Sequence, residues 1–279
     1  MTEKQRAANT SLLKAVSVLK EFARSGPELG VSQVADAVQL PPATAHRILS
    51  TLVQGELLEW NKATRKYRIG ANLYLIGARY LEDTDFLSAA EPVTKIINSL
   101  CGEAVNLSVF SDGSITLVHK QESRYAFRIS TRIGSTMPAY ASSMGKCFLS
   151  QLTESQIDAL YPGDTLEPLT SKTIRSKEVL KEELARVRET GFAHDWEGSY
   201  DGVLGIGSLI RGSDGKGTAG ISISLPVIRI DESAIRRYSD LIKMGAEVVS
   251  FRLGYPGTVS TTHDVDDIER WWNGTMDNE

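Results

Sequence analysis

Two short helices, a proline-rich turn and a basic hairpin lie between residues 31 and 70, and this segment constrains the fold more than any other. In the second expected helix, PATAHRILSTLVQ, the apolar residues share one helical face, namely Ala45, Ile48, Leu49, Leu52 and Val53. At roughly 100° per residue, the opposite face carries small, hydroxyl and guanidinium side chains: Ala43, Arg47, Ser50, Thr51 and Gln54. Such a face suits a nucleic-acid groove. Any solvated helix can carry one too, so the turn and the hairpin strengthen the interpretation.

The segments around this helix predict a three-helix unit followed by a hairpin. Ser32 is expected to cap a short helix, SQVADAVQ, which the motif Leu40-Pro41-Pro42 ends. Upstream, SLLKAVSVLKEFA places four apolar residues at helical spacing, namely Leu12, Val16, Leu19 and Ala23. Downstream, NKATRKYRIG forms a basic turn. This order of elements is that of a winged helix-turn-helix.

Composition places the chain among soluble proteins of two domains. It has 279 residues, of which 41% are hydrophobic and 24% charged. No run approaches the roughly 18 apolar residues that span a membrane, and the start, MTEKQRAANTS, lacks a secretion signal. Cys101 and Cys147 are isolated, so we expect reduced thiols in the cytoplasm, with no disulfide, metal site or cofactor motif.

The net charge of −4 is unevenly distributed along the chain. Residues 1–70 carry ten Lys and Arg against six Asp and Glu, whereas the remainder carries 21 against 29. A basic amino-terminal part on an acidic body supports nucleic-acid contact, although the excess is modest.

After Gly70 the chain alternates between helical and strand patterns. Helices are expected in ANLYLIGARYLED, FLSAAEPVTKIINSLCGEA, ASSMGKCFLSQL, TESQIDALY, SKEVLKEELARVRETG and DESAIRRYSDLIKMGAEVVSFRLG. Strands are expected in AVNLSVF, ITLVHKQ, YAFRIS, VLGIGSLIR and TAGISISLP. The closing segment THDVDDIERWWNGTMDNE is acidic and is expected to fray unless its tryptophans dock. Together these patterns predict an α+β fold with one antiparallel sheet.

With these segments placed, the chain resembles the IclR (isocitrate lyase regulator) family of bacterial transcription factors. Five local motifs carry the resemblance, in order LPPATAHRILSTLVQGELLE, TRKYRIGANLYLIG, MPAYASSMGKCFLS, GFAHDWEGSYDGVLGIGSLI and AGISISLP. The resemblance implies a winged helix-turn-helix DNA-binding domain at 1–70, a linker helix at 71–84, a GAF-like effector-binding domain at 85–255 and an acidic tail at 256–279. It also implies homodimers, commonly paired into tetramers, on a double-stranded DNA operator.

Arg47 is the strongest candidate for reading a base, because its fork can bond guanine O6 and N7. Further DNA-facing candidates on the same helix are Pro42, Ala43, Thr44, His46 and Ser50. Thr44 could equally bond a phosphate, and His46 could instead be packed or cap-bonded. Lys62, Arg65 and Lys66 on the hairpin are expected to hold phosphates or enter the minor groove, unless they form an ordinary solvated cluster.

A ligand pocket is expected around Ser222 and Ser224, which lie two apart on one strand and therefore share a face. Their hydroxyls could grip a polar ligand, or bond each other or the backbone. The resemblance adds the pocket positions Met137, Ser143, Met144, Asp195, Val203 and Gly205, and it implies a small organic acid as the ligand. Ser143 and Met144 stand where residues are often small, Gly205 replaces a larger side chain, and Trp196 stands where a second acid often lies. These departures suggest a reshaped pocket, with Met144 and Trp196 as apolar wall, for a bulkier or aromatic acid.

Two other functions compete with this interpretation. The chain contains no G-x-S-x-G, H-E-x-x-H, P-loop or C-x-x-C motif, and its four histidines are scattered, so we do not expect an enzyme. A ligand-binding sensor or scaffold without DNA binding is the main alternative, which Arg47 and the basic hairpin argue against. The favoured interpretation is a ligand-responsive DNA-binding transcriptional regulator, which we expect to act as a repressor.

Overall fold

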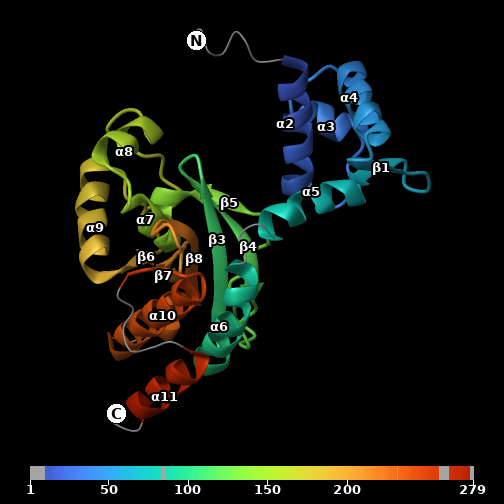
Figure 1. Ribbon diagram of the computed structural model, residues 1–279. Helices are drawn as coiled ribbons and strands as arrows, with labels where there is room; N and C mark the ends of the chain where they lie inside the picture. The colour runs from blue at the N-terminus through green and yellow to red at the C-terminus, as the bar shows by residue number, and fades with distance from the viewer. Residues whose placement is uncertain (1–9, 83–85, 231, 258–263, 277–279) are drawn as a thin grey trace. The chain divides into compact units, whose positions relative to one another are not determined.

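The structure is a computed structural model that describes residues 10–82, 86–230, 232–257 and 264–276. It divides into two compact units, residues 1–83 and 84–279 (Figure 1). In the parts of the chain that are described, no helix has the length and apolar character needed to cross a bilayer.

The first unit is a winged helix-turn-helix. Its elements are α2 (Thr10–Ser25), α3 (Val31–Ala37), α4 (Pro42–Gln54), the antiparallel strands β1 (Leu58–Asn61) and β2 (Lys66–Ile69), and α5 (Ala71–Glu82). The helices α2, α3 and α4 enclose a small core with β1 and β2, formed by Val18, Phe22, Leu29, Val34, Leu49, Leu52, Leu58 and Tyr67. Leu29 and Tyr67 exchange two backbone hydrogen bonds of 2.9 Å, which tie the hairpin to the segment before α3.

The buried face of α4 is the one that its periodicity predicts. Ala45 and Leu49 are fully buried and Leu52 is 7% exposed, whereas His46 and Arg47 are exposed. Pro42 occupies the first turn, where its missing N–H costs nothing.

Helix α2 forms over the expected segment, and its buried residues are Val18 and Phe22, while Leu12 and Val16 are exposed. One local expectation for this unit is wrong. The cap of α3 is Gly30, not Ser32, and the Gln33 side chain accepts the Gly30 N–H at 2.9 Å.

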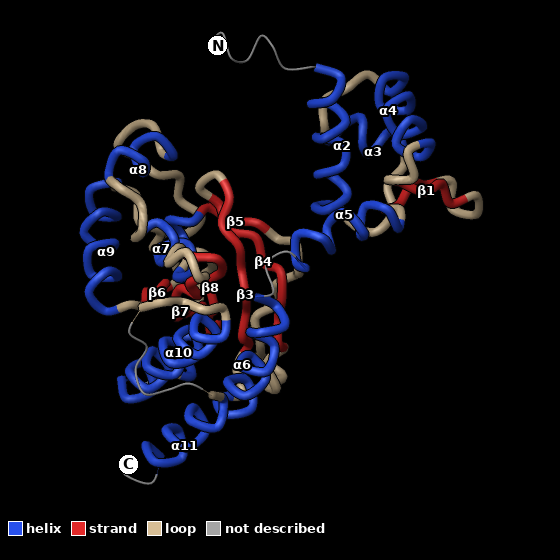
Figure 2. The backbone as a smooth tube through the Cα atoms, in the orientation of Figure 1, coloured by secondary structure: helices blue, strands red, loops and turns tan. Residues whose placement is uncertain are grey.

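The second unit is built on a six-stranded antiparallel sheet (Figure 2). In spatial order the strands are β5 (Thr136–Pro138), β4 (Ser114–Gln121), β3 (Ala104–Ser111), β8 (Gly217–Pro226), β7 (Val203–Arg211) and β6 (Phe192–Trp196). The helical elements are α6 (Phe86–Cys101), η1 (Ala139–Ala141), α7 (Ser143–Leu149), α8 (Glu154–Leu160), α9 (Lys177–Thr190), η2 (Val227–Arg229), α10 (Glu232–Arg252) and α11 (Val265–Met276). This arrangement confirms the expected α+β class with one antiparallel sheet.

The two faces of the sheet differ in character. Helices α6 and α10 cover one face, onto which the central strands direct fully buried residues such as Val105, Ile206 and Ile221. The short helix α7 packs against the other face, where the register places Asn106 opposite Ser222 and Gly205 opposite Ser224. Strand alternation therefore directs the apolar residues to the helices and the polar ones to the α7 side.

The expected strand YAFRIS does not form. Residues 125–130 belong to a loop, and the strand that pairs with β4 is Thr136–Pro138 instead. Hydrogen bonds from side chains occupy backbone groups of this loop, so they are not available to a strand partner. Arg229 bonds the Phe127 carbonyl at 2.8 Å, and Lys120 bonds the Ile129 carbonyl at 3.4 Å.

The acidic carboxyl-terminal segment is a docked helix rather than a frayed tail. α11 packs against α6 and α10 through Ile268, which is fully buried, and Trp272, which is 7% exposed. The Trp272 ring stacks on Tyr238 at 6.0 Å and lies 5.3 Å from the Arg237 guanidinium. The sequence left open that its tryptophans dock, and Trp272 does so.

Candidate DNA-binding surface and ligand pocket

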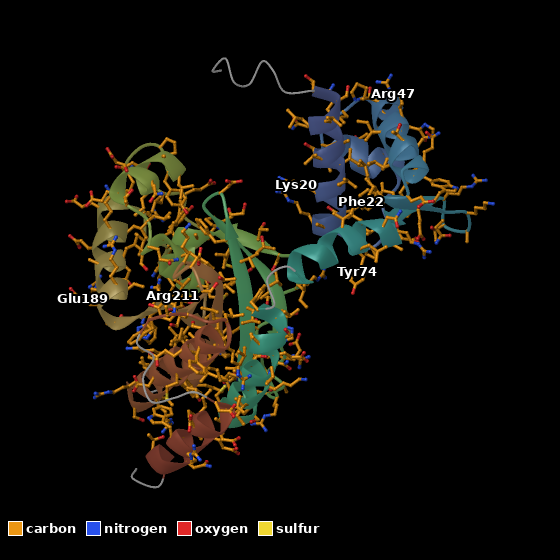
Figure 3. The ribbon with its side chains drawn as sticks, in the orientation of Figure 1. Lys20, Phe22, Arg47, Tyr74, Glu189 and Arg211 are labelled. Carbon is orange, nitrogen blue, oxygen red and sulfur yellow. The ribbon has the colours of Figure 1, made fainter. Side chains whose placement is uncertain are left out.

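Helix α4 presents the predicted DNA-facing residues along its outer side. Pro42, Ala43, His46 and Arg47 are exposed, whereas Thr44 and Ser50 are half-buried. Arg47 extends from α4 into solvent (Figure 3), and among the described residues its guanidinium has no hydrogen bond or ion pair. The Thr51 hydroxyl donates to the backbone carbonyl of Arg47 at 2.9 Å and does not engage the Arg47 side chain.

The hairpin β1–β2 presents cations at its tip. Lys62 and Arg65 are exposed and Lys66 is half-buried. Asn61 shapes the turn, because its Oδ1 accepts the Ala63 N–H at 3.0 Å. A further cation that sequence reasoning did not single out, Arg68, is paired with Glu59 at 2.6 Å and so contributes little free charge.

All eight predicted effector-binding residues lie around one pocket, on the α7 side of the sheet. They come from four regions of the sequence: Met137 from β5, Ser143 and Met144 from α7, Asp195 from β6 with Val203 and Gly205 from β7, and Ser222 and Ser224 from β8. The pocket is a partly open cavity lined mainly by apolar groups, with a few polar groups among them, which is the character of small-molecule sites.

Strand β3 adds two pocket residues that the sequence reasoning missed. Asn106 and Ser108 are buried, and Asn106 Oδ1 and Ser108 Oγ have no hydrogen-bond partner within the described structure. Asn106 Nδ2 donates to Ser224 Oγ at 3.0 Å, so one serine hydroxyl is held by the protein. Buried polar atoms without partners are rare, and here they lie beside a cavity that a ligand can fill. In the sequence, Asn106 and Ser108 alternate with apolar neighbours, and this pattern could have predicted that they face the pocket.

Glycines in β7 allow α7 to approach the sheet closely. A Cβ at Gly205 would lie 3.0 Å from Ser143 Oγ, and one at Gly207 would lie 2.9 Å from Met144 N. Because neither position has a side chain, Ser143 and Met144 reach the pocket floor beside β7.

Asp195 shapes the pocket wall through the turn that follows it. Its Oδ1 accepts Gly198 N–H at 2.8 Å, and its Oδ2 accepts both the backbone N–H and the hydroxyl of Ser199. Burial raises the pKa of the Asp195 carboxyl above its usual range, and the bonds from Ser199 oppose this effect. These contacts position Ser199 and Tyr200, which also line the pocket.

The expectation that Trp196 forms pocket wall is wrong. Adjacent strand residues point to opposite faces, so Asp195 and Trp196 cannot both face the pocket, and Trp196 is 44% exposed. Met144 does line the pocket, and Tyr200 supplies the aromatic side chain instead.

The remaining wall is made of hydroxyl and aliphatic groups. It includes Ile115, Leu117, Ile129, Thr131, Ser135 and Ser142. Among the described lining residues Asp195 is the one charged side chain, and its oxygens are already bonded. The pocket can therefore offer hydroxyls, an amide and apolar surface to a ligand.

Comparison with known families identifies both units. Residues 11–62 match the IclR helix-turn-helix domain, and residues 78–251 match the family described as bacterial transcriptional regulator IclR, C-terminal. The chain therefore belongs to the IclR family of bacterial transcriptional regulators. It is a DNA-binding regulator with a carboxyl-terminal ligand-binding domain, as the resemblance predicted.

Relatives match over almost their whole length. The HTH-type transcriptional regulator KdgR of Escherichia coli is 28% identical over 253 residues, which cover 91% of this chain and 96% of KdgR. The crystal structure of Thermotoga maritima IclR matches with a TM-score of 0.67 and 27% identity, over 88% of this chain and 99% of that one. An IclR homologue from Microbacterium hydrocarbonoxydans, solved in complex with 4-hydroxybenzoate, has a TM-score of 0.74 at 21% identity, over 87% and 100% of the two chains, and this likeness concerns the fold alone.

Proposed function

We propose that this protein is a cytoplasmic repressor that binds a double-stranded DNA operator through α4 and the β1–β2 hairpin. Residues 1–70 bind DNA, 71–84 form the linker, 85–255 bind a small organic or aromatic acid, and 256–279 form an acidic tail. The effector changes operator affinity by binding more tightly to one of two arrangements of the dimer, and it undergoes no chemical reaction.

The convergence of eight residues on one pocket carries the ligand-binding part of this proposal. Strand alternation predicts two of these residues, Ser222 and Ser224, and family position predicts the other six; together they span residues 137–224. The unpartnered atoms Asn106 Oδ1 and Ser108 Oγ beside them provide polar groups that a ligand can satisfy. The large apolar share of the wall and Tyr200 favour a ligand with a ring over a two- or three-carbon acid.

Exposed apolar residues on the first unit support a homodimer, and a pair of dimers as its further assembly. On α2 these residues are Leu12, Leu13 and Val16, and on α5 they are Tyr74, Leu75 and Ile76, each at least 46% exposed. Tyr74 extends from α5 in Figure 3 and is 74% exposed. Apolar side chains clustered on a helix surface mark association sites more often than free surface.

The DNA-binding part is tested by isolating and sequencing DNA that co-purifies with the full-length protein. A recovered fragment should bind in a shift assay, and its affinity should fall steeply with salt, because phosphate contacts release counterions. If no fragment is enriched and binding to upstream DNA shows no salt dependence, the protein is instead a sensor or scaffold without DNA binding.

The ligand part is tested by thermal unfolding of the full-length protein with 4-hydroxybenzoate, glyoxylate and pyruvate. A ligand present at 100 times its Kd stabilises the folded state by about 2.7 kcal/mol. We expect stabilisation by the aromatic acid and its loss when Ser222→Ala and Ser224→Ala are combined. Stabilisation by glyoxylate or pyruvate alone would contradict the proposed ligand class.

A further inference from the structure

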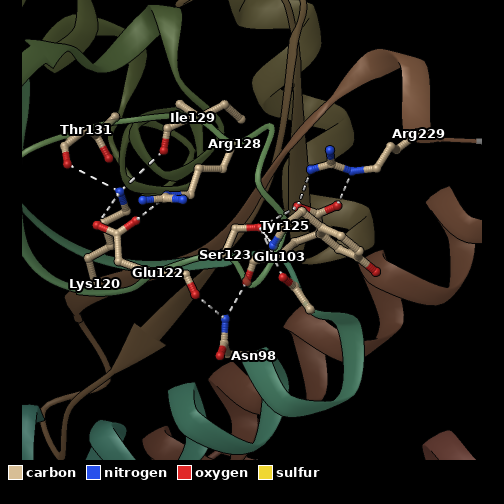
Figure 4. Close-up of polar contacts among 11 residues, drawn as sticks. Asn98, Glu103, Lys120, Glu122, Ser123, Tyr125, Arg128, Ile129, Thr131 and Arg229 are labelled. Atoms are coloured by element: carbon tan, nitrogen blue, oxygen red, sulfur yellow. Dashed lines mark hydrogen bonds and ion pairs between the residues drawn. The ribbon is translucent and has the colours of Figure 1, made fainter.

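The loop between β4 and β5, residues 122–135, forms one wall of the ligand pocket, and we call it the flap. Ile129, Thr131 and Ser135 of the flap line the pocket, and the flap contains no helix or strand. Backbone hydrogen bonds hold its two ends, from Arg124 N–H to the Gly102 carbonyl at 2.9 Å and from Gly134 N–H to the Leu117 carbonyl at 2.7 Å. The middle of the flap is held by the side chains of two basic residues, Lys120 and Arg229 (Figure 4).

Lys120 holds the distal half of the flap. It lies on β4 opposite Asn106, and its side chain is 4% exposed. The ammonium group donates to the carbonyls of Ile129 at 3.4 Å and Thr131 at 3.3 Å, and it pairs with Glu122 at 3.0 Å. A buried cation needs such partners, and the two carbonyls belong to the residues that line the pocket.

Arg229 holds the proximal half through shorter bonds. Its Nε and Nη2 bind the two oxygens of the buried Glu103 carboxylate at 2.7 and 2.8 Å. Its Nη1 donates to the Phe127 carbonyl at 2.8 Å, and the guanidinium lies 4.6 Å from the centre of the Tyr125 ring. The hydroxyl of Ser123, which is also in the flap, donates to Glu103 Oε2 at 3.3 Å. The Glu103 carboxylate therefore binds the flap directly as well as through Arg229.

Both tethers start from elements that carry polar pocket groups. Arg229 belongs to η2, which directly follows β8 with Ser222 and Ser224. Lys120 is paired in register with Asn106, whose Oδ1 has no partner among the described groups.

We propose that Lys120 and Arg229 are positioning residues that hold the flap over the pocket and thereby control ligand entry and release. This inference rests on the proposed ligand binding. The bonds to the flap backbone differ in length, 2.8 Å from Arg229 to Phe127 against 3.4 and 3.3 Å from Lys120, and hydrogen bonds weaken with length. The bidentate pair with Glu103 also fixes the guanidinium of Arg229. The Lys120 tether therefore releases first, and the flap opens at Ile129–Thr131 while residues 123–127 stay attached.

The test measures opening of the flap without any ligand. Ser222→Cys places a thiol in the pocket at a position that is 1% exposed, and iodoacetamide followed by mass spectrometry reports its accessibility. The native Cys101 and Cys147 are buried, and burial raises the pKa of both thiols to about 12, so their background labelling is low.

In the Ser222→Cys protein, Lys120→Met should raise the rate of labelling about tenfold, because three interactions of a charged group are lost. Arg229→Lys keeps a positive charge near Glu103 but loses the fork that also reaches Phe127, and hydrogen exchange should rise at residues 123–127. Lys181→Met is the matched control, because Lys181 pairs with Glu154 and Asp158 away from the pocket. It should leave the labelling rate unchanged.

An unchanged labelling rate in Lys120→Met would overturn the proposal. A faster rate accompanied by an equal increase in global unfolding, measured by Cys147 labelling, would overturn it too, since Lys120 would then be a stabilising residue only. These readouts need no effector. Failure of every acid to stabilise the protein would overturn the proposed ligand class while leaving the flap result intact.

Discussion

Arg47 is exposed to solvent and lies on the face of α4 opposite the core. A guanidinium there can form a bidentate contact with guanine, and each such pair contributes about 1–3 kcal/mol of discrimination. We expect Arg47→Ala to weaken operator binding by about that amount and to relax specificity at one base pair. Shift assays on operator variants substituted one base pair at a time measure both effects.

Lys66→Ala serves as the comparison for Arg47→Ala. A phosphate contact does not distinguish bases, so this change should weaken binding to all sequences alike. It should also reduce the slope of log affinity against log salt concentration by the equivalent of about one phosphate contact. Operator affinity that is identical in Arg47→Ala and the parent would show that α4 does not read the operator as proposed.

The stability of the second unit should depend on pH through His194. Its Nε2 lies 2.8 Å from Ser239 Oγ on α10, and burial lowers the pKa of its imidazole below the usual value. As the pH falls, the His194 imidazole is therefore protonated near pH 6.5 in the unfolded chain but only at a lower pH in the folded protein. The stability that neutral, buried His194 allows is complete above pH 6.5, and it is lost as the pH falls through the lower pKa of the folded protein.

We accordingly expect His194→Gln to reduce the loss of thermal stability between neutral and mildly acidic pH. Ser239→Ala is the control: it removes the hydrogen bond but not the burial, so the pH dependence should remain. Midpoints of thermal unfolding over a pH series test this, and equal slopes in His194→Gln and the parent would assign the acid sensitivity to other groups.

At the scale of elements, α11 covers α6 and α10 beyond the region matched by the family domains, which ends at residue 251. Trp272 is 7% exposed and stacks on Tyr238, whereas Trp271 beside it is half-buried. Trp272→Ala should therefore destabilise the second unit by about 3 kcal/mol, and Trp271→Ala by clearly less. Chemical denaturation, with the transitions of the two units analysed separately, measures the difference.

Equal effects of Trp271→Ala and Trp272→Ala would contradict the docking of α11 through Trp272. The same comparison shows how much stability this added helix contributes to the pocket-bearing unit, since α6 and α10 lie against the face of the sheet opposite the pocket.

At the scale of the whole molecule, two separately folded units must act together if an effector is to change DNA binding. A homodimer through the first unit would place two copies of α4 on one operator. Leu75→Glu on α5 replaces an apolar side chain that is 58% exposed with a charged one. We expect this variant to dissociate toward monomers and to bind operator far less tightly.

Leu169→Glu, at an exposed leucine of the second unit, is the matched control and should leave dimers intact. Sedimentation equilibrium over a range of protein concentrations measures the assembly. A dimer constant that Leu75→Glu leaves unchanged would place the interface elsewhere.

The periodicity of the sequence correctly predicted those elements that have a single buried or pocket-facing side. The apolar stripe of α4 meets one core, and the alternation of Ser222 and Ser224 meets one pocket, so period and face were enough in both cases. Prediction failed for the alternating residues 125–130, which form a loop whose carbonyls accept bonds from Arg229 and Lys120.

By itself the sequence determined the class of fold, the winged helix-turn-helix, the exposed Arg47 and the shared face of Ser222 and Ser224, because helical and strand periodicity follow from local geometry. The other six predicted pocket residues came from the resemblance to the IclR family. Only the tertiary structure decided that Asn106 and Ser108 face that pocket with unpartnered atoms, that Trp196 does not, and that Trp272 docks. These outcomes depend on strand register and on contacts between residues distant in the chain, such as Glu103 and Arg229. Local propensity contains no information about which of several distant partners a side chain meets.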